Sequence, residues 1–515
     1  MGTLVAPPVG ARRDSLALVP ARTGAWADRE SPTAPGHMPL PLALSPPPLR
    51  RPRRGRASWP ELAIVGVVAV AAAVALFHTA WAHPFGTQVG GVGDADEYSW
   101  FLSWVPYALG HGLDPLVSTY VSHPSGINLM WNTSVLLPSL LVSPLTVAFG
   151  AAFSYNVLVT AAPVLTTVLC QLAFRRWVGR LPSLAGALVV GFSPYMVAQS
   201  TGHLAQTLIM SAPLVLLALD RLLVLQQSRP WLDGLLLGLL AWAQLLTGEE
   251  VLAMEAVTAV IAVAVLCAVA RREVGPHFPY AARGVGVAAG VCAALSAPFL
   301  AVQYLGPDKV ENVHPANVYV SDLLNFVVPT NITKLAPAAA LHISSHFTGN
   351  GSEDGAYLGI LLVAFLLLAL VVARRRRVTW VALAIAGAAA VLSMGPTLHV
   401  GGHVSRFPMP DELLQKLPAL HNLLPDRFAS MMTFGAGLLV ALGCDGLKRL
   451  KRPAMASGWA LCAAGLAALV PITNYPAAMS PFYWAFDTGL SCPPAGPQAA
   501  GSQAAGSETG PGHPV

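Results

Sequence analysis

Charged side chains are scarce in this sequence, where Asp, Glu, Lys and Arg make up 11% of 515 residues. A soluble domain carries about 25% of them. Apolar residues amount to 54% of the chain, and the mean hydropathy is +0.58. They recur in runs of about 20 residues, the length of a helix that crosses a bilayer. The shortage of charge therefore excludes an ordinary soluble protein and predicts an all-α polytopic membrane protein.

Cysteine is rare as well, with six residues in the whole chain. No CxxC pair and no spacing typical of metal ligands occurs among them. The sequence therefore indicates neither a disulfide framework nor a zinc site.

The basic residues are clustered, and their positions predict the topology. Residues 1–58 are rich in Pro and Arg, without periodicity, and end near the stretch LRRPRRGR at 49–56. We expect a disordered cytoplasmic tail there. Later basic clusters should also face the cytoplasm, because positive charge is retained on that side of a membrane. They lie at 175–180, 271–272, 374–377 and 448–452.

About 11 transmembrane helices satisfy this rule if the apolar segment 134–150 does not cross. That segment is short and contains Pro138 and Pro144, so we expect a re-entrant or juxtamembrane helix on the outer side. The expected spans lie at 62–82, 154–174, 182–199, 203–224, 231–248, 250–270, 283–303, 355–373, 378–394, 428–447 and 455–474.

This topology predicts a multi-pass protein of the cell membrane with a cytoplasmic N-terminus and an outer C-terminus. The transmembrane domain covers 59–474, and a disordered outer tail covers 475–515. The large polar segments, at 83–153, 304–354 and 395–427, all lie on the outer side. Polar mass on one face indicates chemistry or binding there.

Three carboxylates begin the first outer segment, in the stretch GDADEYSW at 93–100. Asp94, Asp96 and Glu97 precede Trp100 and Trp104, which fit an amphipathic helix at the level of the lipid headgroups. Acidic residues there suit a lipid-linked phosphate in two ways. A pair can hold a divalent cation, Mg²⁺ or Mn²⁺, or one of them can deprotonate an incoming hydroxyl. A solvated loop start is the alternative without function.

Three further polar residues face outward in this topology. Glu250 lies at the outer end of a span, where a carboxylate is either functional or a helix cap. His203 follows a span and is either a ligand or a loop residue. Arg427 enters a span on the side that is poor in positive charge, and a guanidinium binds phosphate with two hydrogen bonds. The alternative for Arg427 is a snorkelling interfacial residue.

The architecture resembles the GT-C superfamily of integral-membrane glycosyltransferases, and more closely a group of bacterial membrane proteins described as glycosyltransferase-like. The matching stretches are WFLSW at 100–104, HPSGINL at 123–129, GFSPY at 191–195, SDLLNF at 321–326, GAYLG at 355–359, MGPTLH at 394–399 and PDRF at 425–428.

The resemblance implies a polyprenyl-phosphate sugar as donor and an acid of the first outer segment, Asp94 or Asp96, as base, with or without a metal. It also implies that Glu250 and Arg427 line the cavity, and we expect Glu97 and His203 to help bind the donor phosphate. The predicted enzyme is a glycosyltransferase that moves a hexose or pentose to an envelope glycan, lipid or protein. No nucleic acid partner is expected.

Two other classes of function fit the sequence. A flippase or transporter of a lipid-linked glycan would show inverted repeats with broken helices, and no convincing repeat is visible. A non-catalytic membrane subunit of an envelope-assembly complex would keep the fold without needing the acids.

Overall fold

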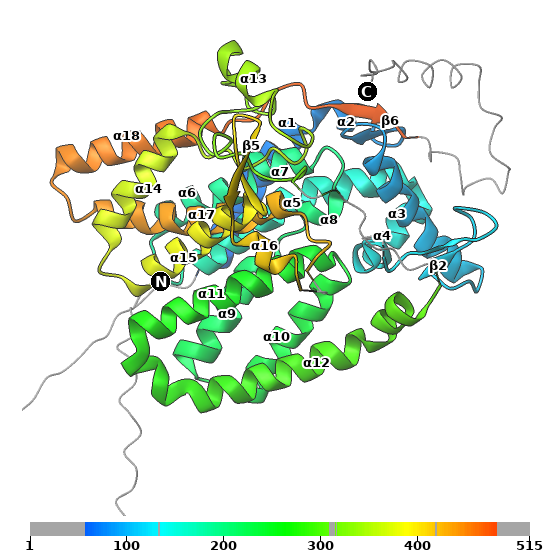
Figure 1. The fold of residues 1–515 in the computed structure, drawn as a ribbon, viewed down its shortest axis with the longest axis horizontal. Coiled ribbons are helices and arrows are strands. Elements are labelled where there is room, and N and C mark those ends of the chain that lie inside the picture. Colours follow the sequence, from blue (N-terminus) through cyan, green and yellow to red (C-terminus); the bar gives the residue numbers. More distant parts are fainter. Residues whose placement is uncertain (1–56, 132–133, 308–314, 316, 418–419, 481–515) are drawn as a thin grey trace, which may run out of the picture. The chain divides into compact units, whose positions relative to one another are not determined.

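The computed structural model describes residues 57–131, 134–307, 315, 317–417 and 420–480. Helices dominate it (Figure 1). The predicted N-terminal tail falls almost wholly outside the described residues. The helices of the first part are α1 (Trp59–Leu76), α2 (His78–Trp81), α3 (Asp94–Gly110), α4 (Leu136–Phe149), α5 (Ala151–Phe174), α6 (Arg180–Gly191), α7 (Pro194–Gln199), α8 (Leu204–Thr207) and α9 (Ser211–Asp220).

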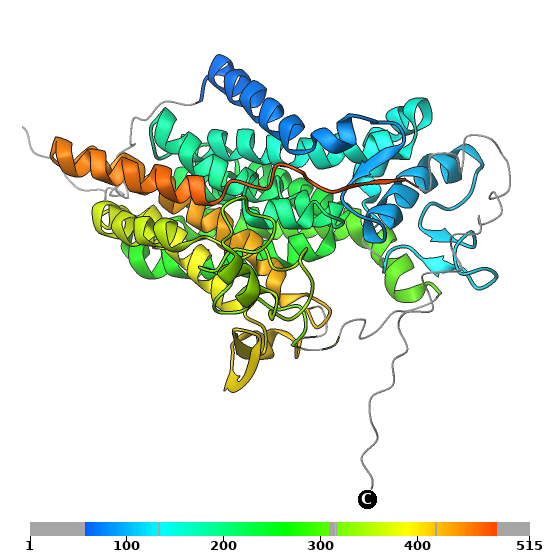
Figure 2. The same ribbon diagram turned by 90° about the horizontal axis from the view of Figure 1, so that it is seen from above.

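The second part adds longer helices, and three short two-stranded sheets occur in the described chain. Its helices are α10 (Pro230–Leu245), α11 (Glu249–Val274), α12 (Phe278–Leu305), α13 (Ala338–Ser344), α14 (Ile360–Ala373), α15 (Arg377–Ser393), α16 (Asp411–Leu414), α17 (Ala429–Leu447) and α18 (Arg452–Ala468). Antiparallel pairs join β1 (Thr87–Val89) to β6 (Ala477–Met479), β2 (Val117–Ser118) to β3 (Ile127–Asn128) and β4 (Thr397–Val400) to β5 (His403–Pro408). The β4–β5 hairpin projects beyond the helices (Figure 2).

Six helical segments of the described chain are long and apolar enough to cross a membrane. They are Trp59–Leu76, Ala151–Phe174, Arg180–Gln199, Glu249–Arg272, Gly275–Leu305 and Pro425–Leu447. The other predicted spans correspond to shorter helices, so the predicted count of about 11 is not confirmed. The segment 203–224, for example, is divided into α8, α9 and a π-helical turn, Arg221–Leu225.

The segment expected to be re-entrant forms α4, with 14 residues. At 1.5 Å per residue such a helix rises about 21 Å, which is less than the ~30 Å hydrocarbon core. Its length therefore agrees with a helix that does not cross. The five cysteines within the described residues are free.

The core of the helical domain is built around α17, whose residues are all buried. It packs against α6, α14 and α15. Where α17 crosses α6, the two helices approach so closely that a Cβ on Gly186 would lie 2.2 Å from the carbonyl oxygen of Gly437. Small residues permit this close contact. In lipid, where no hydrophobic effect drives helices together, such van der Waals packing stabilises their association.

Replacing Gly186 with leucine should force α6 and α17 apart and destabilise the protein by about 1–3 kcal/mol. Thermal unfolding of the purified protein in detergent measures this. Gly290→Leu is the matched control, because no atom lies within 4 Å of a Cβ built on Gly290 in the exposed part of α12. An equal effect of both changes would show that α6 and α17 do not meet as described.

Ion pairs gather where α1, α5, α6, α15 and α17 come together at one end. Glu61 lies 2.8 Å from Arg175 and 3.1 Å from Arg180. Asp445, at the far end of α17, lies 2.6 Å from Arg376 and 3.0 Å from Lys448. The two groups are adjacent, because the backbone N–H of Gly179 donates to Asp445 at 3.4 Å. Three of the predicted cytoplasmic basic clusters, at 175–180, 374–377 and 448–452, therefore meet at this end.

The expected helix after the first carboxylates is present as α3, but its aromatic face is not interfacial. Trp100 and Trp104 are 9% and 1% exposed and stack on each other at 5.5 Å. They face the protein because α3 packs against α4 and α5. The helical periodicity of apolar residues does not show what covers the apolar face. A helix that is buried against other helices therefore has the same pattern as one that lies among the lipid headgroups.

The C-terminal tail begins later than predicted. Tyr475 is buried, its hydroxyl donates to the carbonyl of Val197 at 2.5 Å, and its carbonyl accepts from Thr79 at 2.6 Å. The strand that follows, β6, pairs with β1 directly before α3. Residues 475–480 are therefore part of the folded domain, which corrects the predicted boundary. The remainder of the predicted tail lies outside the described residues.

Candidate functional site

Five titratable side chains meet at the end of α17 opposite the basic groups. Asp94 begins α3, His203 precedes α8, Glu250 stands in the first turn of α11, Glu353 lies before α14, and Arg427 lies in the 3₁₀ turn that leads into α17. Arg427 and Asp445 are 18 positions apart along this segment, which corresponds to about 27 Å of helix. The two charged groups are thus separated by roughly the thickness of a hydrocarbon core.

Asp94 is the member of this group that reaches the surface. Its side chain is 59% exposed, whereas that of His203 is 10% exposed. The Nε2 of His203 donates to the Oδ2 of Asp94 at 2.8 Å. Glycine at position 202 leaves room for this approach. A Cβ there would lie 3.2 Å from the Cβ of Asp94, which is closer than carbon atoms normally pack. Asp94 is therefore accessible to solvent and is held in place by its hydrogen bond from His203.

The other nitrogen of His203 faces inward, to further oxygen atoms. Nδ1 lies 2.8 Å from the Oε1 of Gln199 and 3.5 Å from the Oε1 of Glu353. The amide of Gln199 in turn donates to Glu353 at 2.6 Å and to the carbonyl of Ser352 at 3.1 Å. Both ring nitrogens of His203 thus face oxygen atoms that can accept a hydrogen bond.

Arg427 links two carboxylates deeper in the site. Its Nη2 donates to the Oε1 of Glu353 at 2.8 Å, and its Nη1 pairs with Glu250. Glu353 is 3% exposed and Glu250 19%. Glu250 also accepts from the amide of Gln206. A continuous chain of hydrogen bonds therefore runs from the exposed Asp94 through His203 and Gln199 to Glu353, and from there through Arg427 to Glu250.

The contacts shift the acidity of the two carboxylates that lie outside the membrane-spanning segments. The hydrogen bond from His203 lowers the pKa of Asp94 below its ordinary value, against a smaller opposing effect of burial. Burial alone would raise the pKa of Glu353, but Arg427 and His203 together hold it well below its usual range. Both groups are therefore carboxylates at neutral pH.

Asp96 and Glu97 are placed differently from Asp94. Asp96 accepts from the amide of Gln88 and, at 3.0 Å, from the backbone N–H of Gly93, so it caps its own helix. Glu97 is exposed in the first turn of α3. The structure thus separates the two acids between which the sequence left the choice open, because Asp94 faces His203 whereas Asp96 faces backbone and amide donors.

The predicted pair of Asp94 and Asp96 does not fit a divalent cation. Both oxygens of Asp96 already accept from N–H groups, and Oδ2 of Asp94 accepts from His203. Within the described residues no three His, Cys, Asp or Glu side chains are grouped as metal ligands. Mg²⁺ is usually held by one or two carboxylates together with waters and substrate phosphates, and the hydrogen bonds of Asp96 and Asp94 leave few oxygens of this pair free for it.

Glu353 and Gln199 are the members of the site that the sequence did not single out. Glu353 lies in the segment 304–354, which was predicted to be outer and holds several other polar residues, and nothing in its spacing marks it. Gln199 is uncharged and ends an apolar helix. The available signal in the sequence was the acidic pair Glu353–Asp354 immediately before an uncharged run. Asp354 is buried as well. Its burial, and to a smaller extent the negative charges of Glu353 and Asp322, raise its pKa to about 8.

Two solved structures of glycosyltransferases are similar to the chain. The arabinofuranosyltransferase AftD from Mycobacteria matches over 81% of this chain and 26% of its own, with 15% identity and a TM-score of 0.46. An oligosaccharyltransferase from Archaeoglobus fulgidus matches over 80% of this chain and 56% of its own, with 13% identity and a TM-score of 0.44. The chain spans about a quarter and just over half of these two proteins. At such TM-scores neither lends a residue role or an activity to this chain.

Sequence comparison gives a family without a described activity. No curated protein matches the chain. The profile of a family described as a domain of unknown function, DUF6311, matches residues 64–422, which is more than half of the chain. The matched region contains Asp94, His203, Glu250 and Glu353 and ends five positions before Arg427. The protein belongs to the DUF6311 family.

Proposed function

We propose that the protein is a membrane glycosyltransferase that moves a hexose or pentose from a polyprenyl-phosphate carrier to an envelope glycan, lipid or protein. The observation that carries this proposal is the exposed Asp94, which lies at the accessible end of the buried, hydrogen-bonded chain that leads to Arg427. An accessible carboxylate held by a histidine suits the removal of a proton from a hydroxyl. The nearby Arg427 suits a phosphate.

The outer face is proposed from the distribution of charge. The basic groups around Arg175, Arg376 and Lys448 lie at the end of the helices opposite Asp94, and basic residues are retained on the cytoplasmic side. This supports the proposal that Asp94 and the polar segments lie outside, with the N-terminus in the cytoplasm and the C-terminal strand outside. The donor would then be taken from the outer leaflet.

In the proposed reaction Asp94 acts as general base. It removes the proton of the acceptor hydroxyl while the hydroxyl oxygen forms its bond to the anomeric carbon of the donor. The bond between that carbon and the phosphate oxygen breaks, and its electron pair leaves with the polyprenyl phosphate. Attack opposite to the leaving group inverts the anomeric configuration. The low pKa of Asp94 keeps it in the carboxylate form that the step needs.

Arg427 is proposed to hold the departing phosphate through its Nη1. That nitrogen is paired with Glu250, the more exposed of the two carboxylates, so a phosphate can take the place of Glu250 while Nη2 remains on Glu353. His203 is a positioning residue, since its hydrogen bond orients Asp94. No step is routed through a metal, because the acids near Asp94 do not fit one.

Replacing His203 with phenylalanine should lower kcat by about 10- to 100-fold, because misplacing a base by about 1 Å costs this much. It should also move the acid limb of the pH–rate profile to higher pH. The sign follows from the hydrogen bond: His203 stabilises the Asp94 carboxylate and lowers its pKa, so loss of the donor raises that pKa and protonates the base at a higher pH.

The measurement is the rate of labelled-sugar transfer from polyprenyl-phosphate donors across the acid pH range. His203→Gln retains an N–H donor and should recover much of both the rate and the profile. A His203→Phe protein that is slow but has an unchanged acid limb would contradict the positioning role.

A further inference from the structure

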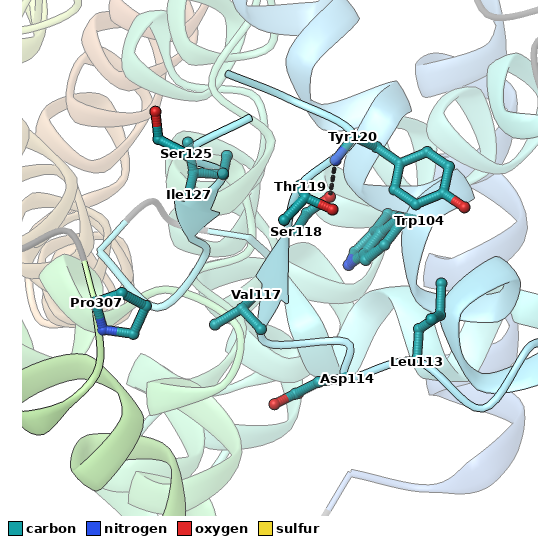
Figure 3. Close-up of a pocket in the computed structure, with 11 residues that line it drawn as sticks. Trp104, Leu113, Asp114, Val117, Ser118, Thr119, Tyr120, Ser125, Ile127 and Pro307 are labelled. Carbon is teal, nitrogen blue, oxygen red and sulfur yellow. Dashed lines mark hydrogen bonds between the residues drawn. The ribbon is translucent and has the colours of Figure 1, made fainter. Parts of the chain in front are cut away.

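A pocket lies beyond the charged site, where the second half of α3 meets the β2–β3 hairpin and the end of α12 (Figure 3). Its volume is 270 Å³. Ligand pockets for drug-sized molecules begin at about 300 Å³, so this one suits one or two small rings. Its lining includes Trp104, Tyr120, Val117, Ile127 and Pro307, and nothing in the proposed reaction uses it.

The walls of this pocket are fixed by hydrogen bonds. The amide of Asn128 donates to the carbonyls of Val302 and Pro307 at 2.8 and 3.1 Å, which ties the hairpin to the end of α12. Trp104 donates to the carbonyl of Pro115 at 3.2 Å. The hydroxyl of Ser118 accepts from the N–H of Tyr120 at 3.1 Å. A preformed pocket loses little conformational entropy when it binds.

The chemistry of the lining is amphipathic. Aromatic and aliphatic side chains form one part, with the ring of Tyr120 lying 5.2 Å from that of Trp104 and 56% exposed. Thr119 and Ser125 add exposed hydroxyl groups. A sugar ring has the complementary surface, because its C–H faces are apolar and its hydroxyl groups lie at the edges.

The charge of the lining selects among sugars. Apart from the phenol of Tyr120, the carboxyl group of Asp114 is the one ionisable group among the lining residues. No Lys, Arg or His belongs to the lining. A phosphate or a sulfated glycan would meet a carboxylate there without a cation. The pocket therefore fits an uncharged saccharide and not the phosphate of the lipid carrier.

The pocket and the charged site lie on one helix. Trp104 and Asp94 are ten positions apart on α3, which corresponds to about 15 Å. A chain of a few sugars can bridge such a distance. We propose that this pocket binds an inner residue of a neutral oligosaccharide acceptor whose terminal hydroxyl reaches Asp94. The assignment as acceptor rests on the function proposed above, whereas the saccharide binding itself does not.

The test is direct binding of neutral oligosaccharides of three to six residues, from the gluco, manno, galacto and arabino series, to the full-length protein in detergent. We expect at least one series to bind by saturation-transfer NMR and titration calorimetry. Tyr120→Ala should weaken that binding about tenfold through loss of the ring face. Tyr120→Phe keeps the ring and should bind within about threefold of wild type.

Two further variants separate the outcomes. Phe407→Ala removes an exposed aromatic residue of β5 outside the pocket and should leave binding unchanged. Asp94→Asn should bind the oligosaccharide like wild type but not transfer to it. Binding without transfer by wild type would sink the proposed function alone. The inference is overturned if no neutral series binds, if anionic glycans bind better, or if Tyr120→Ala binds as wild type does.

Discussion

Replacing Asp94 with asparagine should reduce sugar transfer by about 10²- to 10⁴-fold, the range that a general base contributes. Asparagine has nearly the same size and still offers an oxygen to the Nε2 of His203, which donates to Asp94 at 2.8 Å. It cannot take up the proton of the acceptor hydroxyl. The rate of labelled-sugar transfer by the purified protein measures the loss, and an unchanged unfolding temperature shows that the fold is intact.

Asp96→Asn is the matched control for this experiment. Asp96 stands two positions away on the same helix and caps it through the N–H of Gly93. Its replacement should cost at most about 1 kcal/mol of stability and should leave the transfer rate within a few-fold of wild type. An active Asp94→Asn protein beside an inactive Asp96→Asn protein would assign the base to Asp96 and overturn the site.

Replacing Arg427 with methionine should destabilise the protein by about 3–5 kcal/mol, as expected when one partner of a buried ion pair is removed. Glu353, 3% exposed, and Glu250, 19% exposed, would keep their charges without a cation. Transfer should be lost as well, because the phosphate loses its proposed ligand. Thermal and denaturant unfolding in detergent measures the effect on stability.

Two controls identify the cause of this loss. Adding Glu250→Gln and Glu353→Gln to Arg427→Met removes the uncompensated charges and should recover most of the stability. Lys416→Met breaks an exposed pair with Glu412, whose nitrogen and oxygen are 2.9 Å apart, and should cost about 0–1 kcal/mol. A small effect of Arg427→Met alone, similar to that of Lys416→Met, would show that Arg427 does not hold the two carboxylates together.

The sequence singled out individual residues of the candidate site but not their contacts. Asp94, His203, Glu250 and Arg427 each stood out because a charged or titratable group beside an apolar run is unusual. Their pairing depends on tertiary contacts, since Arg427 and Glu250 are 177 positions apart. Glu353 was missed for the same reason: it becomes important through its contact with Arg427, 74 positions away.

The helical, membrane-spanning character of the chain followed from composition, whereas the count of spans did not. Apolar runs such as 203–224 predict burial, but a buried run can be divided into several short helices. α3 illustrates a related limit. Its period correctly predicted a helix, but Trp100 and Trp104 pack against other helices, and periodicity does not distinguish that partner from a lipid surface.

The central claim is tested most directly by reconstituting the wild-type protein in liposomes that contain radiolabelled polyprenyl-phosphate sugars of several hexose and pentose types. Two readouts, product formation and movement of the intact lipid-linked sugar across the bilayer, are followed in the same sample. We predict transfer of the label to an added acceptor with inverted anomeric configuration and release of polyprenyl phosphate. Movement of the intact donor without transfer would contradict the account and identify a transporter, and a folded protein that does neither would contradict it in favour of a non-catalytic subunit.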